Sequence, residues 1–136
     1  MRHFLFIIGL FFAVSLTAQN NADDIVGYFY SIDPFTKEPS QNYIYKAADG
    51  TYEGKVVWVQ NPKLKHHLGY VFLTKLTFNP KENEWQNGVM LYPGKNGTYK
   101  AYMSITPDGK LKVRGYWGFS MLGKTLYWTR EQELRK

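Results

Sequence analysis

Short stretches rich in Tyr, Val, Trp, Phe and Thr alternate with turn residues along most of this chain. Aromatic and β-branched residues between turn signals are typical of β-strands. The turns include two Asn-Pro steps and Asp49-Gly50, which is a strong hairpin signal. The pattern predicts eight strands, at residues 24–32, 42–47, 51–60, 69–78, 84–92, 98–106, 110–119 and 124–130.

Within the predicted strands, mainly apolar side chains alternate with mainly polar ones. In residues 98–106, one face carries Tyr99, Ala101, Met103 and Ile105. A period of two predicts strands with one packed face, and no stretch has the period of a long amphipathic helix. Sequential strands joined by short turns lie antiparallel, and eight of them favour an all-β, up-and-down β-barrel. A sandwich of two small sheets is the alternative.

Glycine occurs inside the predicted strands more often than strand propensity favours, at Gly27, Gly54, Gly88, Gly115 and Gly118. A small barrel must bend its strands sharply, and glycine permits such bends. The glycines are therefore interpreted as the corners of the barrel.

The first residues differ from the rest of the chain. Arg2 and His3 precede an apolar run from Phe4 to Leu16, and small residues follow up to Ala18. This order predicts a secretory signal peptide at residues 1–18 and a single mature domain at residues 19–136. A transmembrane anchor is the alternative, but the run is shorter than the roughly 20 residues that span a bilayer. We expect a periplasmic or secreted protein, with a monomer favoured.

Composition excludes several classes of site and partner. The chain has no cysteine, which excludes disulfides, thiolate metal sites and lipid attachment to cysteine. Its formal net charge is +6, with the basic residues spread singly over the strands. This spread favours a solvated surface, and attraction to anionic envelope polymers or lipids is the alternative. Export separates the chain from nucleic acid, so that partner is not expected.

The end of the chain resembles an uncharacterised family of secreted bacterial proteins, catalogued as domain of unknown function 2147. Its usual ending reads L-x-V-R-G-Y-x-G, then a few residues, then G-[RK]-T-x-x-W-x-R. The matching positions here are Leu111, Val113, Arg114, Gly115, Tyr116, Gly118, Gly123, Lys124, Thr125, Trp128 and Arg130. The chain departs from the family in having no cysteine, Phe29 where tryptophan is common, and a direct Tyr92-Pro93 step.

The resemblance implies a fold and a closing interaction. The family is similar to lipocalins and other calycins, which implies an eight-stranded barrel with a possible internal cavity. In calycins an arginine near the end of the last strand covers an aromatic ring of the first. The corresponding residues here are Gly27, Phe29 and Arg130, with Trp128 beside them, and their implied role is structural closure.

Six residues are candidates for lining a ligand pocket inside the barrel: Tyr45, Trp58, Phe72, Tyr99, Met103 and Trp117. Small-molecule pockets favour such apolar and aromatic linings. The alternative is that these side chains fill the barrel, because eight strands leave little interior space. Alternation points Arg114 outward, but a bend at Gly115 would turn it inward, where it is the polar candidate for an anionic head group. The alternative role of Arg114, and the commoner one, is a structural salt bridge with one of the few acids.

No residue pattern indicates catalysis or a cofactor. The chain has no cysteine nucleophile, and His66-His67 has no sequence neighbour that would complete a metal site. We therefore expect a binding protein and not an enzyme, with a hydrophobic or amphipathic small molecule as ligand. The alternative is an envelope interaction module with a filled core, which acts through its basic outer surface.

Overall fold

The computed structural model describes residues 19–91, 97–117 and 123–136, and of Trp117 only its place in a strand. The predicted signal peptide and Gly118 lie outside these residues. In the described part of the chain, no helix is both long and apolar enough to cross a membrane.

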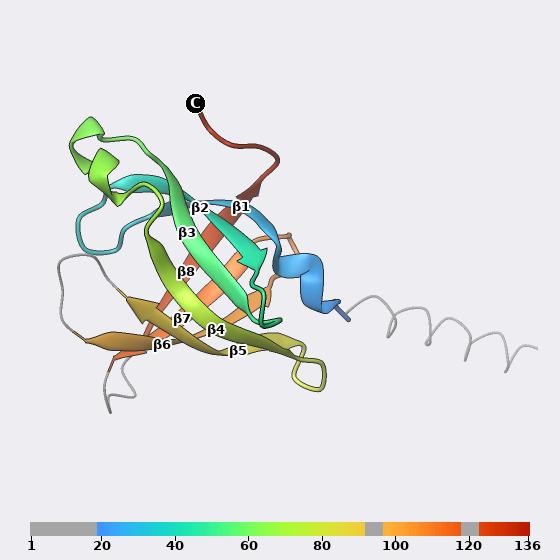
Figure 1. Cartoon of the computed structure of the whole chain (residues 1–136). Helices are drawn as coiled ribbons and strands as arrows, with labels where there is room; N and C mark the ends of the chain where they lie inside the picture. Colours follow the sequence, from blue (N-terminus) through green and yellow to red (C-terminus); the bar gives the residue numbers. More distant parts are fainter. Residues whose placement is uncertain (1–18, 92–96, 118–122) are drawn as a thin grey trace, which may run out of the picture.

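The protein is a closed, all-antiparallel barrel in which each strand pairs with its neighbours in the chain (Figure 1). The strands are β1 (Gly27–Ile32), β2 (Pro39–Lys46), β3 (Tyr52–Val59), β4 (Val71–Asn79), β5 (Glu84–Leu91), β6 (Thr98–Ile105), β7 (Leu111–Trp117) and β8 (Gly123–Glu131). β1 also pairs with β8, with Phe29 opposite Arg130, and this pairing closes the barrel. The predicted fold class is therefore confirmed, and the two-sheet sandwich is wrong.

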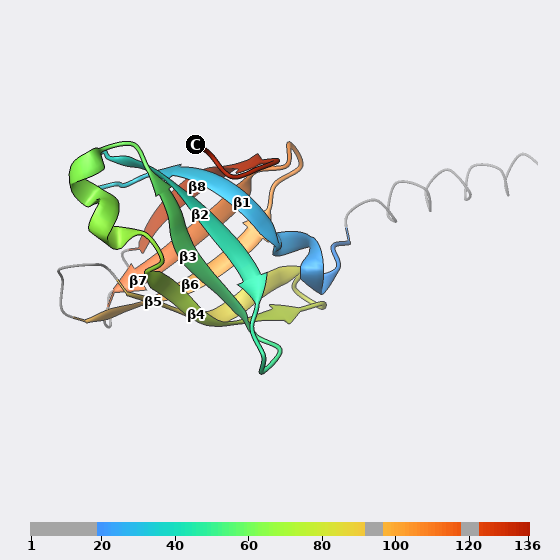
Figure 2. The same ribbon diagram turned by 45° about the horizontal axis from the view of Figure 1, so that its top comes forward.

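Two short 3-10 helices lie at opposite ends of the barrel (Figure 1, Figure 2). η1 (Ala22–Ile25) precedes β1, and η2 (Pro62–His67) connects β3 to β4. We call these two ends the η1 end and the η2 end. η2 lies between two predicted strands, where the sequence indicated no regular element; Pro62 begins it, and the Asn61 side chain accepts a bond from the Lys63 N–H.

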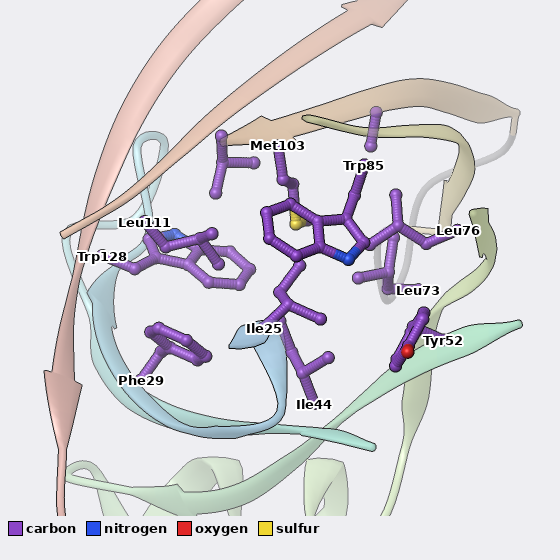
Figure 3. Packing of buried hydrophobic residues seen from close by; sticks show 12 residues of the cluster. Ile25, Phe29, Ile44, Tyr52, Leu73, Leu76, Trp85, Met103, Leu111 and Trp128 are labelled. Atoms are coloured by element: carbon purple, nitrogen blue, oxygen red, sulfur yellow. The ribbon is translucent and has the colours of Figure 1, made fainter. Parts of the chain in front are cut away.

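The core lies toward the η1 end. Its twelve buried members are Ile25, Phe29, Ile44, Tyr52, Leu73, Leu76, Trp85, Ala101, Met103, Leu111, Val113 and Trp128. Figure 3 shows Ile25 of η1 among the strand side chains, near Trp85 and Ile44. The Trp85 indole N–H donates to the Ala22 carbonyl at 2.9 Å, so η1 is fastened to the barrel by both packing and a hydrogen bond.

Candidate functional site

One layer of the interior is traced by paired residues on five neighbouring strands. Gly54 pairs with Leu73, Leu73 with Met90, Met90 with Tyr99, and Tyr99 with Trp117. Paired residues of antiparallel strands present their side chains on the same face. Leu73 is fully buried in the core, so the side chains of this layer face inward. Tyr99 is half-buried and lies on the side of the layer nearer to the η2 end.

Two inward-facing glycines show that the packing differs along the barrel. A Cβ added at Gly88 would lie 2.8 Å from a Leu76 methyl carbon and 3.1 Å from the Ala101 carbonyl oxygen. A Cβ added at Gly115 would meet, among the described atoms, only the Lys100 carbonyl oxygen at 4.0 Å. The wall is therefore tightly packed at Gly88, whereas the described atoms leave room at Gly115, which lies on the inner face of β7 opposite Ala101.

The inner row of β8 ends in a lysine. Trp128 pairs with Leu111, Leu126 with Val113, and Lys124 with Gly115, so Lys124 belongs to the row that faces the interior. Its side chain is exposed, and its Nζ lies 5.3 Å from the centre of the Phe35 ring in the β1–β2 connection. Along the inward-facing row of β8, the side chains thus differ from one end to the other, from the buried indole of Trp128 to the exposed ammonium group of Lys124.

Three small polar side chains lie together on the inner faces of β1 and β2. The Asn42 amide donates to the Ser31 hydroxyl at 3.0 Å, and the hydroxyls of Ser31 and Ser40 are 3.3 Å apart. Asn42 is opposite Phe29, which fixes its face as the inner one. The interior therefore contains hydrogen-bonding groups beside its aromatic rings.

The η1 end is sealed by Arg130. Its guanidinium carbon lies 4.7 Å from the centre of the Phe29 ring, and its N–H groups donate to the Val26 and Asp24 carbonyls. Gly27 gives it space, because a Cβ there would lie 2.7 Å from Arg130 Nη1. Burial lowers the pKa of Arg130, against the opposing charge of Asp24. This group is held by backbone carbonyls and an aromatic ring, and acts in barrel closure.

Three of the candidate pocket residues do lie inside. Met103 is buried in the core, Phe72 packs with its ring edge against Trp128 at 6.0 Å between centres, and Tyr99 belongs to the inner layer. Trp117 stands opposite Tyr99 in β7, and its side chain lies outside the described residues. Whether these residues bind a ligand stays a prediction.

Tyr45 and Trp58 were placed inside wrongly. Ile44 is fully buried, so its neighbour Tyr45 points outward, where its hydroxyl donates to Glu53 at 2.9 Å. Burial and this bond raise the pKa of Tyr45 to about 12. Trp58 pairs with Gln41 across a bulge, and its indole N–H donates to the Lys136 carbonyl at 3.2 Å. The C-terminal tail therefore covers Trp58 on the outer surface.

Arg114 also lies on the outer face, as the alternation of β7 indicates. Its Nε donates to the Tyr116 hydroxyl and its Nη1 to the Thr125 hydroxyl, both at 2.8 Å. Its guanidinium also lies 5.1 Å from the centre of the Tyr116 ring. Arg114 is thus not the inward-facing cation, and the expected salt bridge is replaced by bonds to neutral hydroxyls.

Lys124 is the inward-facing cation that the sequence reasoning missed. The signal was present, because Lys124, Leu126, Trp128 and Arg130 share one face of a strand with a period of two. Among the described residues, no three or more His, Cys, Asp and Glu side chains are placed to share a metal ion. The site is therefore an interior layer of apolar and small polar groups that ends in one lysine.

A hollow lies on the outer surface of the barrel. It is a shallow groove of about 360 Å³, open to solvent, and is lined by Tyr28, Tyr43, Lys55, Val56, Val57, Leu68, Gly69 and Leu134. The rings of Tyr28 and Tyr43 are 4.7 Å apart between centres. The groove is separate from the interior layer, because Tyr43 shares the outer face with Tyr45.

Comparisons with known proteins agree with this geometry. One solved structure, protein HP1028 from the human pathogen Helicobacter pylori, is described as belonging to the lipocalin family. It is 18% identical to this chain, covers 80% of it and 84% of its own length, and superposes with a TM-score of 0.65. No curated protein matches. The family described as "Uncharacterized protein conserved in bacteria (DUF2147)" matches residues 27–130, and the chain belongs to this family.

Proposed function

We propose that this protein binds a small hydrophobic or amphipathic molecule in the half of the barrel toward the η2 end. The observation that carries the proposal is the room that the described residues leave on the inner face of Gly115, beside an inward row that ends at Lys124. An apolar lining with a few polar groups suits a small-molecule site. The lipocalin-like fold supports this proposal. Arg130 seals the η1 end, so we infer that a ligand enters from the η2 end.

The proposed function is binding and not catalysis. In the described part of the inner layer the polar groups are hydroxyls, an amide and one ammonium group. These groups suit orientation of a ligand, whereas acid–base or nucleophilic chemistry needs a paired base or an activated nucleophile.

The proposed location is the bacterial envelope or the exterior. Its support is the order of residues 1–18, which follows that of a secretory signal. The test is the intact mass and N-terminal sequence of protein recovered from the periplasm or medium of a bacterium that expresses the full chain. A mature chain that begins at Gln19 supports export, and an uncleaved chain retained in the cytoplasm would contradict it.

Ligand binding is tested by native mass spectrometry of protein purified from a bacterial envelope, followed by organic extraction. We expect a bound small molecule in the native protein and its loss in Gly115→Leu, which would fill the free space. Thr129→Leu adds similar bulk to an exposed outer position of β8 and should keep the ligand.

Two outcomes would overturn the proposal. One is protein that is always empty and takes up no apolar fluorescent probe. The other is equal binding by Gly115→Leu and the native chain, which would place the ligand elsewhere. Attention would then move to the outer surface, where tight and salt-sensitive binding of an anionic polymer would favour the interaction module.

A further inference from the structure

The connecting segments at the two ends of the barrel differ in charge. At the η1 end, η1 and the turns 47–51, 80–83 and 106–110 carry five acids and two lysines: Asp23, Asp24, Asp49, Glu82, Asp108, Lys81 and Lys110. At the η2 end, segments 33–38 and 60–70 carry two acids and three lysines: Asp33, Glu38, Lys37, Lys63 and Lys65. Lys124, a strand residue near the start of β8, also lies at the η2 end, as the strand residues Lys46 and Arg130 lie at the η1 end. The charge of the described connecting segments thus favours an anion at the η2 end.

Lys124 differs from the other lysines of that end in its position. It alone of the four lies on an inward-facing strand row, since Lys37, Lys63 and Lys65 belong to connecting segments. The described residues contain two ion pairs, Lys46–Asp23 and Arg135–Glu131, and neither involves Lys124. Its contact is with the face of the exposed Phe35 ring, which holds the ammonium group without neutralising it.

The depth of the barrel between Lys124 and the core limits the length of the ligand tail that can enter. Lys124 and the buried Trp128 are four positions apart along β8. That distance is about 13 Å along a strand, and a tilt of about 40° reduces it to about 10 Å of barrel depth. Tyr99, Gly115 and Leu126 line this depth on β6, β7 and β8, so this part of the wall is mainly apolar.

We propose that the ligand is an amphipathic carboxylate with a medium-length hydrocarbon tail. Its head pairs with Lys124 Nζ beside Phe35, and its tail occupies the space on the inner face of Gly115. A charged head held at the entrance stays partly hydrated, so its desolvation costs little, while burial of the tail supplies the hydrophobic free energy. This inference rests on the proposed ligand-binding function and assigns its ligand class.

The test compares three ligands with one tail and different heads: octanoate, octanol and octylamine. Each is titrated by calorimetry into the mature protein in a buffer of physiological salt. We expect octanoate to bind about tenfold more tightly than octanol, and octylamine to bind most weakly. In Lys124→Gln we expect octanoate to fall to the affinity of octanol, while octanol binding is unchanged.

The matched control is Lys37→Gln. Lys37 carries the same charge at the same end, but its Nζ donates to the Pro34 carbonyl at 3.1 Å within its own loop. The preference for octanoate should persist in this variant, which separates a direct contact from the general field. Unchanged octanol binding by Lys124→Gln shows that the variant is folded.

The two proposals fail in different ways. If octanoate and octanol bind native protein equally, or if Lys37→Gln and Lys124→Gln lose the preference alike, the assignment of the head group to Lys124 is wrong while ligand binding stands. If none of the three binds and an apolar fluorescent probe is also excluded, the ligand-binding function itself is wrong.

Discussion

At the scale of single residues, two glycines of similar sequence context have opposite surroundings. Gly88 and Gly115 both lie inside strands and face inward, opposite the same residue, Ala101. Around Gly88 the nearest atoms are closer than an added methyl group allows, whereas the described atoms around Gly115 leave room for one. The difference arises because Gly88 faces the packed core, and Gly115 faces the proposed site.

Alanine substitution should therefore separate the two positions. Gly88→Ala should lower the free energy of unfolding by about 1–3 kcal/mol through overpacking. Gly115→Ala should leave it unchanged or raise it by up to about 1 kcal/mol, because alanine restricts the unfolded chain. Urea unfolding followed by tryptophan fluorescence measures both. Equal costs at the two positions would show that the space at Gly115 is filled.

Residue-scale reasoning from sequence succeeded for some side chains and failed for others. Met103 alternates with polar neighbours and was correctly predicted inside. Tyr45 failed because both faces of its strand carry apolar or aromatic residues, so a period of two does not choose between them. Trp58 failed because a bulge between Gln41 and Asn42 changes the register, which no local pattern reveals.

At the scale of elements, a tyrosine of β3 adds a further attachment of η1 to the barrel. The Tyr52 hydroxyl donates to Asp23, and burial, followed by this bond, raises the pKa of Tyr52 to about 12. The fold thus favours the neutral phenol. The contribution of the bonded Tyr52 phenol to the free energy of unfolding is complete below pH 10, the ordinary pKa of tyrosine. This contribution is lost as the pH rises toward about 12.

Removing this hydroxyl should loosen η1. Tyr52→Phe should cost about 1 kcal/mol at neutral pH and reduce the loss of stability between pH 10 and about 12. Urea midpoints measured across that range test this. The control is Tyr45→Phe, whose hydroxyl bonds Glu53 on a neighbouring strand. Faster hydrogen exchange of the Asp24 amide is expected in Tyr52→Phe alone, and identical exchange in both variants would contradict the role of Tyr52.

The C-terminal tail is a second attached element. Arg135 lies between the rings of Tyr30 and Trp58, at 4.5 and 5.0 Å from their centres, and forms two bonds to Glu131. The bond from Arg135 is the main cause that lowers the pKa of Glu131. A lowered pKa stabilises the fold above the unfolded value of about 4.3, and this contribution is lost as pH falls through the folded value.

The tail should therefore detach in acid before the barrel unfolds. The reporter is the Trp58 indole N–H, which bonds the Lys136 carbonyl, and its NMR signal should move as pH falls below the usual range of glutamate. The Trp85 indole, bonded to Ala22 in the core, should not move and serves as an internal control. In Arg135→Ala the Trp58 signal should already occupy the detached position at neutral pH. Simultaneous movement of both indoles would indicate global unfolding instead.

At the scale of the whole molecule, the sequence was sufficient to predict the barrel, but not to predict whether side chains fill its interior. Turn residues and period-two strands of similar length specify the number and order of strands, because short connections leave few topologies. Whether the interior is filled depends on contacts such as Leu76 with Gly88, which join residues on different strands. The charge difference between the two ends likewise emerges only when the turns are assigned to ends.

Closure makes the stability of this barrel a property of the entire chain. Arg130 of the last strand donates to two carbonyls before β1 and covers Phe29 of the first, so it joins the two ends of the chain. Arg130→Met should lower the free energy of unfolding by about 2 kcal/mol. Because the first and last strands pair directly, tryptophan fluorescence and far-ultraviolet circular dichroism should give the same lowered urea midpoint. Separate midpoints would mean that β1 and η1 detach alone, and that the arginine fastens an end without holding the barrel closed.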